Sequence, residues 1–347
     1  MDLSALNPEQ RKAAEKLDGP LLILAGAGSG KTRALTYRVA NLIDHGIPAW
    51  SILALTFTNK AAKEMRTRVE NLIGKEKAEE AWISTFHSTC ARILRRDIEK
   101  IGYSRSFTIY DDDDQQRILK EILKQFNIDD KFLPVREIRA KISDAKNRMM
   151  MPDEWFQQTI RDRRNSLIHD VMTEYEKRMK TLNALDFDDL LLKTLILLAD
   201  NPPVLEVYRR RFRYVLVDEY QDTNRTQYEL LRLLSSESRN LCVVGDDDQS
   251  IYGWRGADIR NILEFENDFP DAVVIKLEQN YRSTGNILDA ANHVIAHNEG
   301  RKDKTLWTEK DEGEKITVYC AQDERDEAAW IIQQIQEMRK KGSPLSF

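Results

Sequence analysis

Residues 21–32 decide the fold of this 347-residue chain; they read Leu21-Leu22-Ile23-Leu24-Ala25-Gly26-Ala27-Gly28-Ser29-Gly30-Lys31-Thr32. The first half is an apolar run typical of a buried strand, and the second half is a glycine-rich turn that opens a helix. The turn departs from the phosphate-loop pattern G-x-x-x-x-G-K-[ST] only at its first position, where Ala25 replaces glycine. In such a loop backbone N–H groups surround phosphate oxygens, Lys31 adds a positive charge, and Thr32 offers a hydroxyl to Mg²⁺. The stretch therefore predicts a phosphate site at the end of a strand.

The alternative interpretation is a small-residue turn that merely connects a strand to a helix. Lys31-Thr32 stands at the offset that phosphate binding requires, and a mere connection does not need it. The helix that opens at Lys31 also directs its positive dipole end toward the loop. The predicted phosphate-binding residues are Ala25, Gly26, Ala27, Gly28, Ser29, Gly30, Lys31 and Thr32.

A second apolar run, residues 214–217, ends in the acidic pair Asp218-Glu219. Open α/β sheets place ligands at the carboxyl ends of their strands, so we expect this pair to face the glycine-rich loop. Asp218 would then hold Mg²⁺ together with Thr32, and Glu219 would activate the attacking water as a general base. The two segments together predict the chemistry of nucleotide triphosphate hydrolysis.

Short apolar segments alternate with helical stretches along the chain, which predicts a parallel sheet wrapped by helices. The expected strands are 21–25, 52–57, 82–85, 215–218, 241–245 and 273–277. Residues 109–186 show helical periodicity without a convincing strand and are interpreted as a helical insertion. After residue 277 we expect a second unit with a helix at 280–298, a strand at 316–320 and a helix at 324–339. Only about 70 residues remain for it, fewer than the roughly 100–150 of a typical domain, so we expect a truncated unit.

The composition, 41% hydrophobic and 32% charged, is that of an ordinary globular protein, and the net charge of −5 excludes nucleic-acid binding by bulk charge alone. A local basic groove stays possible, and residues 131–148 carry six basic side chains against two acidic ones. This segment is interpreted either as a surface for backbone phosphates or as an ordinary solvated helix face.

Cys90, Cys242 and Cys320 lack disulfide or zinc spacing and are expected to be core thiols. The N-terminus lacks a signal-peptide pattern, which predicts a cytoplasmic location.

The acidic pair continues as Tyr220-Gln221-Asp222, and the complete run D-E-Y-Q-D resembles the UvrD, PcrA and Rep group of superfamily 1 DNA helicases. Other segments resemble motifs of this group in the same order. They are 6–10 (the Q motif), 55–62 (Ia), 84–88 (Ib), 186–190 (a further DNA-facing segment), 244–257 (III) and 279–283 (IV). The resemblance thus covers residues 10–283, and the group's later motifs have no match before Phe347.

The resemblance implies a nucleotide site with residues beyond the loop and the acidic pair. Gln10 would read the adenine edge, which favours ATP, and Arg33 and Tyr281 would lie around the adenine and its phosphates. Gln249 follows the expected strand 241–245 and could reach the γ-phosphate and the attacking water. Arg282 would act on the γ-phosphate when two domains close, an effect worth about 10³ to 10⁵ in rate in arginine-finger systems. A surface salt bridge is the alternative for Arg282.

The resemblance also implies a surface for single-stranded DNA. The expected contacts are Phe57, Asn59, His87, Phe187, Tyr252, Trp254 and Arg255. Bases stack on exposed aromatic rings at about 1 to 3 kcal/mol each with little sequence preference. Each ring taken singly would more commonly be a core residue. Trp254 is the exception, because glycine and arginine flank it. Gln249, the expected sensor of the γ-phosphate, lies only five residues earlier, so Trp254 would couple base stacking to that sensor.

The resemblance implies an α/β fold with three parts. A RecA-like P-loop NTPase domain with a parallel sheet would comprise residues 1–109 and 187–275. A helical subdomain would be inserted at 110–186, and 276–347 would begin a second RecA-like domain. The implied function is an ATP-dependent 3′-to-5′ DNA helicase that requires Mg²⁺ and acts on single-stranded DNA and duplex junctions in repair or replication.

Two other functions stay open at this point. The chain could be a nucleotide-regulated module that binds single-stranded DNA without motor activity, or the front part of a helicase-nuclease subunit. A small-molecule kinase is disfavoured, because it explains neither Gln249 nor the aromatic residues. If the chain is the front part of a helicase, we expect it to bind and hydrolyse ATP without unwinding a duplex on its own.

Overall fold

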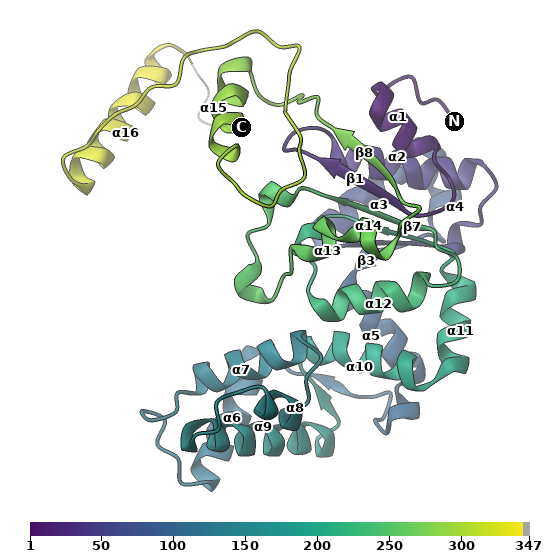
Figure 1. Ribbon diagram of the computed structural model, residues 1–347, viewed down its shortest axis with the longest axis vertical. Coiled ribbons are helices and arrows are strands. Elements are labelled where there is room, and N and C mark those ends of the chain that lie inside the picture. Colours follow the sequence, from purple (N-terminus) through teal and green to yellow (C-terminus); the bar gives the residue numbers. More distant parts are fainter. Residues whose placement is uncertain (343–347) are drawn as a thin grey trace.

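The computed structural model describes residues 1–342, except for the side chain of Arg255. Its centre is a six-stranded, wholly parallel sheet with the strand order β3-β2-β6-β7-β1-β8 (Figure 1). The strands are β1 Leu21–Ala25, β2 Ile52–Thr56, β3 Trp82–Thr85, β6 Tyr214–Val217, β7 Leu241–Gly245 and β8 Val273–Leu277. The expected α/β class is confirmed, and the six strands were predicted to within one residue at each end.

The strands β1, β2, β6 and β7 are buried on both faces, which explains why they are almost entirely apolar, whereas the edge strand β8 is partly exposed. Leu22 and Leu24 of β1 belong to one hydrophobic cluster, whereas Leu21 and Ile23 belong to another. The helices that supply the first cluster include α5 Phe86–Asp97, α10 Phe187–Asp200, α11 Pro202–Arg211, α12 Arg225–Ser235, α13 Arg260–Leu263 and α14 Phe265–Asp268. Those of the second cluster are α1 Pro8–Glu15, α2 Lys31–Asp44, α3 Asn59–Ile73 and α4 Lys75–Ala78. The sheet is thus the middle layer of three.

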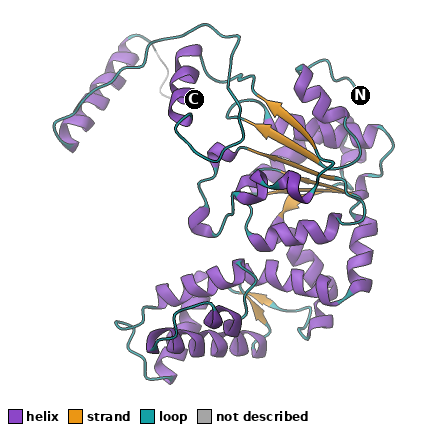
Figure 2. Cartoon of the chain, viewed as in Figure 1, coloured by secondary structure: helices purple, strands orange, loops and turns teal. Residues whose placement is uncertain are grey.

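Residues 112–181 form a separate group of helices below the sheet in Figure 2. Its helices are α6 Asp112–Gln125, α7 Val135–Asn147, α8 Pro152–Gln157 and α9 Arg163–Thr181, and they share a hydrophobic cluster of their own. The chain leaves through β4 Thr108–Ile109 and returns through β5 Ala184–Leu185, which pair in parallel. The acidic run at 111–114 caps α6, since the side chain of Asp111 accepts hydrogen bonds from the backbone N–H groups of Asp113 and Asp114.

The C-terminal part contains α15 Gly285–Ile295 and α16 Glu324–Lys340, and α16 stands apart from the sheet (Figure 1). The strand predicted at 316–320 is wrong, because these residues have no regular secondary structure. A strand needs a neighbour for its backbone hydrogen bonds, and no described segment pairs with 316–320. The expectation of a core thiol is also wrong for Cys320, which is exposed, whereas Cys90 and Cys242 are buried.

Among residues 1–342, no helix combines the length and the apolar character that crossing a bilayer requires.

Candidate active site

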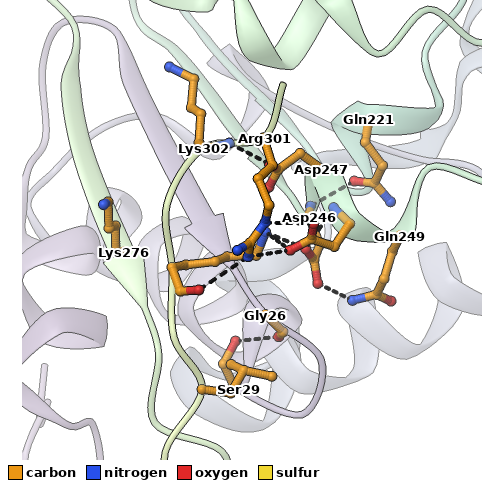
Figure 3. A network of polar contacts seen from close by, with 12 residues as sticks. Gly26, Ser29, Gln221, Asp246, Asp247, Gln249, Lys276, Arg301 and Lys302 are labelled. Atoms are coloured by element: carbon orange, nitrogen blue, oxygen red, sulfur yellow. Dashed lines mark hydrogen bonds and ion pairs between the residues drawn. The ribbon is translucent and has the colours of Figure 1, made fainter. Parts of the chain in front are cut away.

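The glycine-rich loop joins β1 to the first turn of α2 and has two residues in the left-handed region of the backbone map. Gly28 has φ +68° and Gly30, which precedes α2, has φ +84°. A Cβ on Gly30 would also lie 2.6 Å from Nε2 of Gln10, so glycine is required there for two reasons. The Ser29 hydroxyl donates to the Gly26 carbonyl at 2.7 Å and closes the loop on itself (Figure 3). The loop is therefore a fixed turn at the carboxyl end of β1.

Gln10 lies directly against this loop. Its amide Nε2 donates to the Ser29 carbonyl at 2.8 Å, and the residue is buried. It is positioned by a reciprocal capping box at the start of α1, in which the backbone N–H of Gln10 donates to the Asn7 side chain and the Gln10 side chain accepts from the backbone N–H of Asn7. Asn7 also donates to the Tyr281 hydroxyl at 2.9 Å. The structure therefore brings Gln10 and Tyr281 to one side of the phosphate loop.

Arg33 and Tyr281 approach the loop through different groups. Arg33 is exposed on the first turn of α2, and its Nη2 donates to the Ala5 carbonyl at 2.7 Å. The backbone N–H of Tyr281 donates to the Gly28 carbonyl at 3.0 Å. Both residues border the loop, and Tyr281 does so from a segment more than 250 residues later in the chain.

The acidic pair meets the loop from β6. Nζ of Lys31 lies 3.1 Å from Oε2 of Glu219, and Oγ1 of Thr32 lies 3.4 Å from Oδ2 of Asp218. Glu219 has φ +50° and ψ +44°, a left-handed conformation that is strained for a residue with a Cβ and that is concentrated at functional sites. Glu219 lies two residues after the end of β6, and its left-handed backbone begins the short 3-10 helix Tyr220–Asp222.

Asp218 fits the role of a magnesium ligand. Burial, helped by the neighbouring Glu219 carboxylate, raises the pKa of Asp218 to about 6 against the opposing effect of Lys31. A buried carboxylate of this kind favours a nearby cation, and the Thr32 hydroxyl supplies a second oxygen. Mg²⁺ prefers oxygen ligands and is bound in nucleotide sites by one or two carboxylates together with phosphates. Thr32 and Asp218 therefore have the chemistry of such a site.

Gln249 is connected to the acidic pair through two residues to which the sequence analysis gave no role, Asp246 and Gln221. Nε2 of Gln249 donates to Oδ2 of Asp246, and the backbone N–H of Asp246 donates to Oε1 of Gln221 at 3.0 Å. Nε2 of Gln221 donates to Oε2 of Glu219 at 2.9 Å. Figure 3 shows Gln249, Asp246 and Gln221 side by side. Gln221 had a signal in the sequence, since it lies inside the D-E-Y-Q-D run.

Arg282 lies in an exposed turn whose backbone covers the phosphate loop. Nδ2 of Asn280 donates to the Ala27 carbonyl at 2.6 Å, and the backbone N–H of Arg282 donates to Oδ1 of Asn280 at 2.8 Å. Within residues 1–342 no carboxylate forms an ion pair with Arg282, so the salt-bridge alternative has no support among them. The start of the Arg282 side chain lies against the loop, since a Cβ added to Gly28 would lie 2.9 Å from its Cβ.

The aromatic residues expected to face DNA differ in exposure. Phe187 is 52% exposed and Trp254 is 75% exposed. Phe57 is half-buried, and its ring centroid lies 5.8 Å from that of Phe86. The ring centroids of Tyr252 and Trp254 lie 6.4 Å apart. Phe57 and the Tyr252–Trp254 pair follow β2 and β7, so they lie at the same sheet edge as the phosphate loop.

The polar residues expected to contact DNA lie near these rings. Asn59 is exposed at the start of α3, and His87, at the start of α5, lies 5.9 Å from Phe187 between ring centroids. Burial lowers the pKa of His87 below its usual value, so its ring is neutral at pH 7 and could donate a hydrogen bond but carry no charge. The side chain of Arg255 lies outside the described residues.

The basic segment 131–148 is not one continuous surface. Lys146 is buried, with Nζ 2.8 Å from Asp186, 2.9 Å from Asp189 and 2.8 Å from Glu176. Its ammonium therefore pairs with carboxylates inside the protein and cannot contact a phosphate backbone. The interpretation of the whole segment as a phosphate-binding surface is wrong at this position.

Known proteins are similar to this chain over nearly its whole length. The family profile described as UvrD/REP helicase N-terminal domain matches residues 6–270, and the UvrD-like helicase C-terminal domain matches residues 275–346. The chain is 52% identical over 342 residues to the ATP-dependent DNA helicase PcrA of Staphylococcus epidermidis, covering 98% of this chain and 47% of that protein. The PcrA of Bacillus subtilis is 52% identical over 341 residues, covering 98% and 46%. The chain thus spans about half the length of the curated relatives it matches.

Proposed function

Because this chain belongs to the UvrD/Rep helicase family, we propose that it is part of an ATP-dependent helicase that moves 3′ to 5′ along single-stranded DNA. The observation that carries the proposal is the meeting of Lys31 with Glu219 and of Thr32 with Asp218 at one sheet edge. The exposed rings of Tyr252 and Trp254 follow β7, which ends at the same edge. Hydrolysis and DNA contact would therefore share the loops that follow neighbouring strands.

The proposed chemistry assigns one task to each polar group. The backbone N–H groups of the loop and the Lys31 ammonium bind the β- and γ-phosphates of ATP. Thr32 and Asp218 hold Mg²⁺, which when bound neutralises charge on the phosphate oxygens. Glu219 accepts the proton of the attacking water. Gln249 orients that water, and Arg282 stabilises the charge on the transferred γ-phosphate.

We further propose the three-part division stated above, with motor domain 1–109 and 187–275, helical insertion 110–186 and second unit 276–347. The separate hydrophobic cluster of the insertion supports it, as does the paired exit and return of the chain at β4 and β5. A cytoplasmic location and partners among repair or replication proteins are proposed as well.

The test is the ATPase rate of the purified chain with and without an oligothymidylate strand in the presence of Mg²⁺. A motor fragment with intact chemistry is expected to hydrolyse ATP slowly alone and several-fold faster with the strand. A module that only binds DNA under nucleotide control would bind both ligands and show no stimulated hydrolysis. That result would overturn the proposal in favour of the binding module.

A further inference from the structure

A segment of the C-terminal part, residues 301–307, crosses the carboxyl edge of β7 and β1. The backbone N–H of Trp307 donates to the Glu278 carbonyl at 3.0 Å, which aligns the segment with the end of β8. Leu306 packs on the phosphate loop so closely that a Cβ added to Gly26 would lie 2.2 Å from its Cδ2. Nζ of Lys276 on β8 donates to the Asp303 carbonyl. The segment therefore contacts the nucleotide loop directly.

The side chain of Lys304 enters a cluster of three consecutive carboxylates after β7. Its Nζ lies 2.9 Å from Asp246, 2.5 Å from Asp247 and 2.6 Å from Asp248, and the residue is 7% exposed. Ligand oxygens of the three aspartates lie within 4.8 Å of one another, as in a metal site. The cation that they hold in this structure is the protein's own ammonium group.

The surrounding contacts fix this arrangement on both sides. Arg301 pairs with Asp248 through two hydrogen bonds of 3.0 and 2.8 Å, and the backbone N–H of Lys302 donates to Asp247 at 2.8 Å (Figure 3). The three aspartates thus face two cations, Lys304 and Arg301. Both cations come from the 301–307 segment, and they are buried and half-buried, respectively. Removal of the Lys304 ammonium is strongly unfavourable, because it is shared by all three carboxylates and its loss leaves buried negative charge unpaired.

Asp246 connects this cluster to the catalytic residues. Its carboxylate pairs with Lys304 on one side and accepts a hydrogen bond from Gln249 on the other. Its backbone N–H donates to Gln221, which in turn donates to Glu219. A continuous line of polar contacts therefore runs from the C-terminal part of the chain to the proposed general base.

We propose that Lys304 is a positioning residue that makes the placement of Gln249 and Glu219 depend on the position of the C-terminal part. The inference rests on the proposed function, since it concerns the same ATPase site. When the 301–307 segment moves with the second unit, Asp246 loses its ammonium partner and must find another. The donors that remain on its carboxylate are the Gln249 amide and the backbone N–H of Asp248, so a shift of the carboxylate displaces the Gln249 side chain. Hydrolysis is thereby coupled to the arrangement of the two units.

The test variant is the double substitution Lys304→Met with Asp247→Asn, which removes one cation and one anion and so leaves the net charge of the cluster unchanged. Lys302→Met is the matched control, because its ammonium pairs with Glu266 outside the cluster. Asp247→Asn alone keeps the contact between Lys304 and Asp246. With oligothymidylate present, we expect the double variant to lose about tenfold in kcat with KM for ATP within about threefold of the parent. Both controls are expected to stay within about twofold in kcat.

A second measurement does not depend on catalysis. Hydrogen exchange at residues 244–249 is expected to accelerate in the double variant and to stay unchanged in Lys302→Met. Equal kcat values for the double variant and the controls would overturn the inference while leaving the ATPase proposal intact. If the parent chain has no ATPase activity, the proposed function fails, and unchanged exchange at 244–249 would then overturn the positioning role of Lys304 as well.

Discussion

Nζ of Lys31 lies 3.1 Å from Oε2 of Glu219, although 188 residues separate them in the sequence. The contact forms because β1 and β6 flank β7 in one parallel sheet and end at the same edge. An ammonium and a carboxylate at this distance in a partly buried site attract each other, and a nucleotide phosphate would compete for the same ammonium. The ion pair therefore occupies the position where substrate charge is expected.

Glu219→Gln is expected to reduce ATP hydrolysis by about 10²- to 10⁴-fold, because an amide cannot accept the proton of the attacking water. The amide keeps the size of the side chain, so binding of ATP with Mg²⁺ should remain within a few fold, measured by calorimetry. Glu237→Gln, at an exposed ion pair with Arg209, is the control. A Glu219→Gln variant that hydrolyses ATP at the parent rate would remove the general-base role.

Gly30→Ala tests the fixed turn of the phosphate loop. At φ +84° a Cβ adds about 1 kcal/mol of backbone strain, and here it would also collide with the Gln10 amide at 2.6 Å. Gly46 has the same φ of +84° with nothing within 4 Å of an added Cβ, so Gly46→Ala carries the strain alone. We expect both variants to lose stability in urea unfolding and only Gly30→Ala to lose nucleotide binding. Equal nucleotide affinity in the two variants would contradict the role of the close contact.

The central strands of this fold could be predicted from the sequence because they are buried on both faces and are therefore almost entirely apolar. The juxtaposition of Thr32 with Asp218 could be expected as well, since both follow parallel strands. The expected strand at 316–320 shows the limit of such reasoning. An alternating apolar pattern indicates that a segment can form a strand, but the strand forms only where a neighbour accepts its hydrogen bonds.

The buried ion pairs of Lys146 and Lys304 could not be predicted from the sequence. Lys146 looked like one of several surface lysines, yet its partners Asp186 and Asp189 lie 40 or more residues later. Lys304 likewise meets Asp246 from 58 residues away. Local patterns contain no information about such pairs, because the pairing depends on how whole helices and loops are packed.

Trp254→Ala is expected to weaken binding of single-stranded DNA about tenfold, since base stacking on an aromatic side chain contributes on the order of 1 to 3 kcal/mol. Trp254 is 75% exposed, so the thermal stability of the chain should change little. Trp50→Ala is the control, because Trp50 is 44% exposed but precedes β2 and so lies at the opposite edge of the sheet. Fluorescence anisotropy of a labelled oligothymidylate measures both variants. Equal affinity for Trp254→Ala and Trp50→Ala would exclude Trp254 as a stacking platform.

The buried charge network around Lys146 predicts a pH dependence of stability. Two ammonium groups, Lys146 and Lys193, face the three carboxylates of Glu176, Asp186 and Asp189. Burial, followed by repulsion from Asp186, raises the pKa of Asp189 to about 7. Its unfolded pKa is near 3.8, so the folded state retains a proton between about pH 4 and pH 7 that the unfolded state has lost. Stability from this group is therefore lost as the pH rises through that range.

Asp189→Asn removes the titrating carboxyl and keeps an oxygen that can accept the backbone hydrogen bond from Asp186. We expect the stability of this variant relative to the parent chain to increase by on the order of 2 kcal/mol between pH 5 and pH 8. Urea unfolding at a series of pH values measures the difference, with Asp200→Asn, at the exposed end of the same helix, as the control. If Asp189→Asn and the parent lose stability in parallel over this range, the proton is not held by Asp189, and the excess negative charge of the network must be neutralised at another carboxylate.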